Sequence, residues 1–254
     1  MKNNVTRVSS LIVALAAVGA SAPSMAQVSA QGTIGVANMY LWRGLNNTPD
    51  GAQVQGGVKL SHDVGVYGGF WATTETGGHE TDLYLGWAKA FGPFSIDLSY
   101  WIYLYPEDQT TESPSSAVPS FDMSDTTVAD AVVAASYAIN EAFSVGAAAY
   151  IQQDDFAGAA ENADEDNYFT LTGTYKTVSL TYGWWSRETP ATVANGLGAA
   201  EDEYSHIDVA WKATDGLSFA VSFKSSDLGT DDGGVDEDPL FKVAYDWSFD
   251  LMKM

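Results

Sequence analysis

The sequence predicts an all-β fold, an antiparallel up-and-down transmembrane β-barrel of about twelve strands. Stretches of roughly ten residues carry apolar side chains at every second position, most clearly over 94–104, 217–224 and 241–249. This period of two gives each strand one apolar and one polar face. The apolar faces are rich in aromatic residues and carry no charge, and the chain contains no long apolar run. Strands of ~9–11 residues with these properties are typical of a barrel that spans a membrane.

Twelve segments match this strand pattern. They are 29–43, 52–61, 66–74, 80–91, 94–105, 127–138, 143–153, 166–176, 178–186, 203–213, 217–226 and 239–250. The connections between them alternate between tight turns rich in Gly, Pro, Asn and Asp and the longer loops 44–51, 75–79, 106–126, 154–165, 187–202 and 227–238. An even number of strands with short turns at one rim and long loops at the other indicates an up-and-down barrel, its short rim periplasmic.

The first 26 residues have the pattern of a signal peptide. Lys2 and Arg7 are followed by the apolar stretch 11–18 and by Ser24-Met25-Ala26, a small-x-small cleavage site. The apolar stretch is too short for a transmembrane anchor. We therefore expect residues 1–26 to direct Sec-type export and residues 27–254 to form one barrel domain in the outer membrane of a Gram-negative bacterium. The chain has no cysteine, so disulfides and thiol chemistry are excluded.

The chain is strongly acidic. It carries 33 acidic and 11 basic residues and a formal net charge of −22. This imbalance argues against nucleic-acid binding. The acids concentrate in the predicted long loops, and the densest group is the mouth acidic cluster Asp231, Asp232, Asp236, Glu237 and Asp238. Each residue alone is best explained as solvated surface, but together they would attract cations to the mouth of a pore.

If the apolar side chains of each strand point outward, the side chains that alternate with them line the lumen. The predicted pore-lining residues are Arg43, Asp82, Asp97, Lys176, Asp208, Lys212, Lys224 and Asp246. Arg43 would be either a pore-lining cation or half of a structural ion pair. The mixed signs leave open a second interpretation, in which internal ion pairs plug a barrel that does not conduct.

The chain is also rich in aromatic residues, with 8 Trp, 13 Tyr and 11 Phe. Outward parity and position predict two interfacial girdles that include Tyr40, Trp42, Phe70, Tyr100, Trp184, Trp211, Tyr245 and Trp247. Trp101, Tyr103 and Tyr105 share the parity of Asp97 and are expected to point inward, either to guide a ligand or to fill space.

No pattern for catalysis or for a cofactor is present. The chain has three histidines, His62, His79 and His206, and no Gly-x-Ser-x-Gly, His-Glu-x-x-His or Walker sequence. Ser205 and His206 are strand neighbours that point to opposite faces, so they cannot form a catalytic pair. The acidic stretch 230–238 could suit calcium, but its carboxylates do not follow EF-hand spacing. We expect no enzymatic activity, no cofactor and no metal.

Five sequence blocks in the first half of the chain resemble the TorF family of proteobacterial outer-membrane barrels. The blocks are GVANMYLWRG (35–44), VQGG (54–57), GVYGGFW (65–71), ETDLYLGW (80–87) and LYP (104–106). The resemblance is strong over 32–106 and diffuse afterwards. It implies an outer-membrane porin without catalytic residues. The chain departs from the family pattern at Asn38 and Met39, where Ser and Asp are usual.

We therefore expect a porin-like channel for passive diffusion of small hydrophilic solutes that prefers cations. Twelve strands enclose a lumen that is intermediate in width between the lumens of eight-stranded and sixteen-stranded barrels, so the pore should be narrow. Loop 106–126, the longest, is the expected constriction. The expected partners are outer-membrane lipid, small solutes or cations, and the barrel-assembly machinery during biogenesis. The alternative is a closed structural or adhesion barrel with acidic surface loops.

Overall fold

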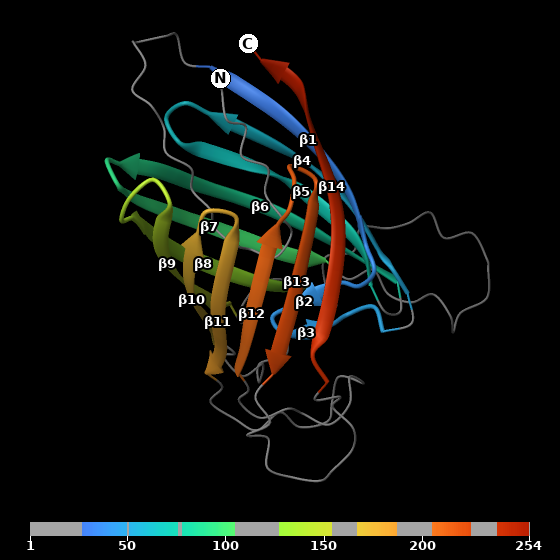
Figure 1. The fold of residues 1–254 in the computed structure, drawn as a ribbon. Coiled ribbons are helices and arrows are strands. Elements are labelled where there is room, and N and C mark those ends of the chain that lie inside the picture. The colour runs from blue at the N-terminus through green and yellow to red at the C-terminus, as the bar shows by residue number, and fades with distance from the viewer. Residues whose placement is uncertain are drawn as a thin grey trace, which may run out of the picture.

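The computed structural model describes residues 27–49, 51–75, 78–104, 127–153, 167–186, 205–224 and 238–253. The predicted signal peptide and most of the predicted long loops lie outside these residues. The described residues form a closed barrel of twelve antiparallel strands, which confirms the predicted fold class (Figure 1). A hairpin of two very short strands is added to the barrel.

The barrel strands follow one another around the wall in chain order. Their bounds are β1 Val28–Ala37, β4 Gln53–His62, β5 Val66–Glu75, β6 Gly78–Phe91, β7 Phe94–Leu104, β8 Thr127–Ala138, β9 Phe143–Gln152, β10 Asn167–Tyr175, β11 Val178–Ser186, β12 Ser205–Lys212, β13 Leu217–Lys224 and β14 Leu240–Lys253. Strand β1 pairs with β4 on one side and with β14 on the other, which closes the sheet. Because Ser29 lies opposite Lys253, β1 begins and β14 ends at the same rim, which is also the rim of the short turns.

The first predicted strand, 29–43, is wrong beyond Ala37. The side chain of Asn38 explains where β1 ends. Its Nδ2 donates to the carbonyl of Phe241 at 2.8 Å, and its Oδ1 accepts from the backbone N of Val243 at 2.7 Å. An amide side chain therefore occupies the hydrogen-bonding groups of β14 that a continuing strand would use, and the backbone of residues 39 onward leaves the wall.

Several other predicted boundaries differ from the structure, and two of these differences change the interpretation of a segment. The segment 75–79 is a tight connection and not a long loop, because β5 and β6 remain paired as far as Glu75 opposite Gly78. The last strand continues past the predicted end at residue 250 to Lys253. A register shift between Ala30 and Gln31 keeps β14 paired with β1 over this extension.

The barrel has an apolar exterior and many polar side chains in its interior. Exposed outward side chains include Leu85, at 64% exposure, and Trp247, at 62%. Others are Ile34, Val36, Val54, Leu60, Phe70, Leu83, Leu98, Val133, Leu171, Leu180, Val209, Trp211, Phe223, Phe241 and Tyr245. An apolar surface of this extent is unfavourable in water, whereas lipid is a suitable solvent for it. No helix among the described residues is long and apolar enough to cross a membrane.

About half of the buried positions of the barrel are polar or charged, and an apolar cluster that includes Val132, Tyr150 and Trp185 occupies another part of the interior. The polar and charged positions include Gln53, Gln55, Thr73, Glu80, Asp82, Asp97, Asp130, Thr181, His206, Ser222, Lys242 and Asp246. Inward glycines allow large rings to lie flat against the wall. An added Cβ at Gly86 would lie 2.5 Å from the ring of Tyr67, and at Gly183 it would lie 2.4 Å from His206 Nε2. These rings narrow the lumen and bring their polar atoms to its carboxylates.

Candidate functional site: a lumen crossed by a hairpin

The segment that follows β1 folds into the barrel as a hairpin, β2 (Leu41–Trp42) and β3 (Leu45–Asn46). Arg43 and Gly44 form its turn, with φ of 47° and 85°. Positive φ at both central residues is the signature of a type I′ turn, which matches the twist of two antiparallel strands. Backbone bonds close its base, since Asn47 N donates to Tyr40 O at 2.8 Å.

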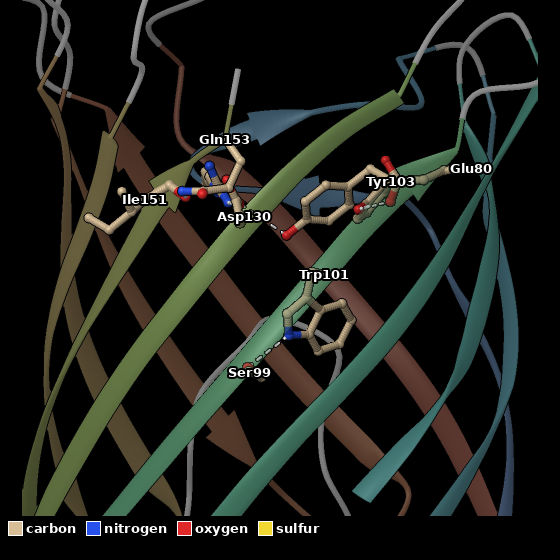
Figure 2. Close-up of polar contacts among 9 residues, drawn as sticks. Glu80, Ser99, Trp101, Tyr103, Asp130, Ile151 and Gln153 are labelled. Atoms are coloured by element: carbon tan, nitrogen blue, oxygen red, sulfur yellow. Dashed lines mark hydrogen bonds and ion pairs between the residues drawn. The ribbon is translucent and has the colours of Figure 1, made fainter. Parts of the chain in front are cut away.

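The turn of this hairpin places the Arg43 guanidinium in a cage of aromatic rings. Its carbon lies between 4.6 and 4.8 Å from four ring centroids, those of Trp42, Tyr150, Tyr168 and Trp185. Arg43 Nη2 also contacts Asp130 Oδ2 at 2.6 Å, and the Tyr103 hydroxyl donates to the same oxygen at 3.1 Å. Figure 2 shows Tyr103 and Asp130 meeting inside the barrel at the level of the hairpin.

The hairpin reaches opposite parts of the wall. On one side, the Tyr40 hydroxyl donates to Glu80 Oε1 on β6 at 2.8 Å, and the Tyr40 ring packs edge-on against Trp71 of β5. On the other side, Gly44 lies directly against His206 of β12. A segment that contacts β5, β6, β8 and β12 must cross the lumen, so the hairpin is a constriction.

Gly44 allows the hairpin to fit against the wall. A side chain there would be strained by the φ of 85°, and its Cβ would lie 2.7 Å from His206 Cγ. We therefore expect Gly44→Val to displace the hairpin and to increase single-channel conductance. Gly51→Val is the matched control, because a Cβ at Gly51 meets no atom of the described residues within 4 Å. Equal conductance of the two inserted variants would contradict this role of the hairpin.

The lumen contains a cavity of about 280 Å³ beside the hairpin. Among its lining residues are the predicted pore-lining residues Arg43, Asp82, Asp97, Asp208 and Asp246. The inward-pointing Trp101 and Tyr103 also line it. Figure 2 shows Trp101 projecting from β7 into the barrel, where its Nε1 donates to Ser99 Oγ at 3.1 Å.

Several of these lumen carboxylates are held by neighbouring side chains. The Tyr67 hydroxyl donates to Asp97 Oδ1, and Gln55 Nε2 donates to Asp246 Oδ1. Asp208 Oδ1 lies 2.9 Å from Nδ1 of His206. His206 Nε2 lies 2.7 Å from the Tyr168 hydroxyl, so this histidine connects Asp208 with the wall of the arginine cage.

The three predicted pore-lining lysines lie at strand ends. Lys176 lies in the turn after β10 with a φ of 54°, is exposed, and has its Nζ 5.3 Å from the Tyr175 ring. Lys212 ends β12 and contacts Asp215 of the adjacent turn at 3.6 Å. Lys224 ends β13 and is half-buried. The structure therefore places Lys176 and Lys212 at the rim of the short turns, away from the hairpin. Lys224 lies directly opposite His206 on the neighbouring strand, and His206 lies against Gly44 of the hairpin.

Of the mouth acidic cluster, only Asp238 is described, and it is exposed. Asp231, Asp232, Asp236 and Glu237 lie outside the described residues, as do the calcium candidate around them and loop 106–126. Within the ranges that the structure describes, no group of three or more His, Cys, Asp and Glu side chains could hold a metal ion.

Parity alone did not identify the residues that form the constriction. Tyr40 and Trp42 were predicted to lie in the outer aromatic girdle, and this is wrong, because both are inside the barrel. The partners Asp130, Tyr150, Tyr168 and Trp185 were not predicted as site residues. The sequence signal that could have indicated the hairpin turn is Arg43-Gly44, a pair that interrupts a strand pattern with a charge and a residue suited to positive φ.

Comparison with protein families identifies the family of the chain. Residues 19–155 match the model of a family of bacterial proteins of unknown function (Gcw_chp), and the chain belongs to this family. The matched segment includes all five sequence blocks that resemble the TorF family. The matching model does not carry that name, so the TorF resemblance stays a prediction. No curated protein sequence matches the chain.

Solved structures of similar fold include bacterial porins. The KdgM porin is 10% identical, with 86% of this chain and 99% of that chain covered and a TM-score of 0.47. The NanC porin is 11% identical, with 87% and 98% covered and a TM-score of 0.43. A structure from a study of in-meso crystallization of membrane proteins is 10% identical, with 87% and 84% covered and a TM-score of 0.50. At such identities the likeness concerns the fold alone.

Proposed function

We propose that this chain is an outer-membrane channel for passive diffusion of small hydrophilic solutes. The observation that carries the proposal is a barrel with an apolar exterior, many buried polar and charged side chains on its inner wall, and a cavity of about 280 Å³ in its lumen. Lipid solvates such an exterior, and the polar wall can exchange hydrogen bonds with a hydrated solute. In this account, lipid and the solutes are the partners, and Sec-type export and barrel assembly deliver the chain.

The hairpin makes the channel narrow. It crosses the lumen from β5 to β12 and is fixed by Arg43 and Asp130. Solutes would have to pass between this hairpin and the wall, where Asp82 and Asp97 line the cavity. Carboxylates in a confined polar passage stabilise cations more than anions, which supports the proposed cation preference.

Swelling of liposomes in small sugars tests the channel. Vesicles that contain the folded barrel should swell at a rate that falls with sugar size, because the hairpin limits the passage. Vesicles with the same amount of inserted barrel and no swelling would contradict the proposal.

Charge-neutralising variants should separate two sources of cation preference. Replacing the mouth acidic cluster, Asp231, Asp232, Asp236, Glu237 and Asp238, with neutral amides should move the reversal potential in a salt gradient toward zero. This effect should fade in high salt, because the Debye length is only ~3 Å at ~1 M. Replacing Asp97 or Asp208 with Asn should have an effect that persists in high salt, because these groups line the confined lumen.

An unchanged reversal potential in both sets of variants, measured on pores that still conduct, would contradict the cation preference. Such a result would indicate that the acidic residues contribute to solubility and not to permeation. Neither result depends on the identity of the solute, since potassium chloride is enough for the measurement.

A closed structural or adhesion barrel is the second candidate function. The ion pair between Arg43 and Asp130, together with the hairpin across the lumen, favours it, since both fill the interior. This candidate predicts inserted barrels without swelling or conductance and calcium-dependent attachment of cells that display them. The swelling assay therefore decides between the two candidates.

A further inference from the structure

Asp82 lies beside the hairpin in a second cluster of acidic and aromatic side chains. On the inner face of β6, its direct cross-strand neighbours are Trp71 on β5 and Tyr103 on β7. One step further along the same face, Tyr84 pairs with Trp101, and their rings stack at 4.4 Å. All five residues line the lumen cavity. Aromatic side chains therefore surround the carboxylate on both neighbouring strands.

The carboxylate of Asp82 has an acceptor that this part of the chain does not use. Asp82 is only 3% exposed, yet its Oδ1 accepts no hydrogen bond from any residue that the structure describes. Other lumen carboxylates differ, since Tyr67 donates to Asp97 and Gln55 donates to Asp246. Leaving a buried carboxyl oxygen without a donor is costly, so a cationic donor that enters the cavity would be stabilised there.

The neighbouring arginine cage indicates which class of ligand fits. There, one carboxylate and four aromatic rings hold the guanidinium of Arg43. The Asp82 cluster offers the same two kinds of group, and Glu80 two residues away on the same face adds negative charge. Ring faces attract organic cations, whereas a divalent metal requires several oxygen ligands.

We propose that Asp82, Trp71, Tyr84 and Trp101 form a binding site for small organic cations, namely primary ammonium and guanidinium compounds. An N–H of the ligand donates to the Asp82 carboxylate, and its alkyl part and charge lie against the aromatic rings. The site deepens the proposed function and rests on it for access, because it assigns a class of solute to the same lumen.

Calorimetric titration of the folded barrel in detergent micelles tests the site, with n-butylammonium as the probe and n-butanol as its uncharged analogue. The wild-type barrel should bind butylammonium saturably and butanol much more weakly. Asp82→Asn should weaken butylammonium binding by about tenfold or more, as expected for loss of a charged hydrogen bond. Trp101→Leu should also weaken binding, because it removes an aromatic face.

Asp215→Asn is the matched control, because it removes the same charge from an exposed turn at the short rim, and it should bind like the wild type. Heat-dependent gel migration establishes that each variant is folded, and Trp101→Leu supplies the test if Asp82→Asn does not fold. Wild-type affinity in folded Asp82→Asn or Trp101→Leu, or equal binding of butanol and butylammonium, would overturn the site.

The titration and the swelling assay can contradict the cation site and the channel separately. A barrel that passes sugars but does not bind butylammonium leaves the channel intact and overturns the cation site. A barrel that binds butylammonium in micelles but causes no swelling supports the site and overturns passive diffusion.

Discussion

Replacing Arg43 with alanine should raise the single-channel conductance several-fold. The substitution removes the 2.6 Å contact with Asp130 and the four ring contacts that hold the hairpin turn. Desolvated cation–π contacts contribute about 2 kcal/mol or more, and breaking a buried ion pair costs about 3–5 kcal/mol. Strands β2 and β3 have two residues each, so they cannot hold the hairpin in place by themselves.

Two further variants refine this expectation. Arg43→Lys keeps the charge but loses the planar guanidinium that contacts rings and carboxylate together, so its conductance should be intermediate. The double variant Arg43→Ala with Asp130→Asn removes the unpaired carboxylate that the single variant leaves behind, and it should conduct at least as well as Arg43→Ala. Conductance equal to that of the wild type in all three inserted variants would show that the hairpin does not limit permeation.

Replacing Leu85 with arginine should destabilise the inserted barrel by about 2–4 kcal/mol, the range measured for Arg or Lys at the midplane of membrane barrels. Leu85 lies near the middle of β6 and is 64% exposed on the outer face. In water, arginine at such a position would be harmless. The loss of stability is therefore a direct consequence of lipid contact, and denaturant titration of the barrel in vesicles measures it.

Val64→Arg is the matched control for this variant. Val64 is 55% exposed but lies in the short turn between β4 and β5, outside the membrane-spanning part. Its substitution should change the free energy of unfolding by no more than about 1 kcal/mol, as for charges near the interface. Similar effects of the two substitutions would contradict the assignment of the outer face to lipid.

The strand pattern was sufficient to predict the barrel, because alternation is local and repeated. For β7, Ile96, Leu98 and Tyr100 alternate with Asp97 and Ser99, and the observed strand follows the predicted one to within one residue. An even number of such strands with short turns at one rim is the pattern of a closed membrane barrel, although the pattern does not specify strand tilt or register. The predicted fold class was therefore confirmed, although several boundaries moved.

The constriction was not predicted, because strand alternation does not show whether an apolar side chain contacts lipid or the interior of the barrel. Tyr40 and Trp42 continue the period of β1, and this pattern predicted that they face lipid. They instead contact other aromatic side chains inside the barrel, Trp71 and Trp185. Their destination depends on partners far away in sequence, and a period of two carries no information about such contacts.

The site residues also include some that strand alternation could place and some that it could not. Asp82, Asp97, Asp208 and Asp246 could be placed on the inner wall by parity, and the structure finds them there. The pairing of Arg43 with Asp130 depends on the hairpin that brings two segments 87 residues apart together. The role of the acidic loops stays a prediction, since most of their residues lie outside the described ranges.

Single-channel recording of the wild-type barrel in a planar bilayer, under a potassium chloride gradient, shows whether this chain is a channel. The barrel should insert in discrete steps of low conductance, because the hairpin crosses the lumen. The reversal potential should have the sign expected for cation preference, because carboxylates line the cavity. A folded and inserted barrel that carries no current would contradict the claim that this chain is a channel.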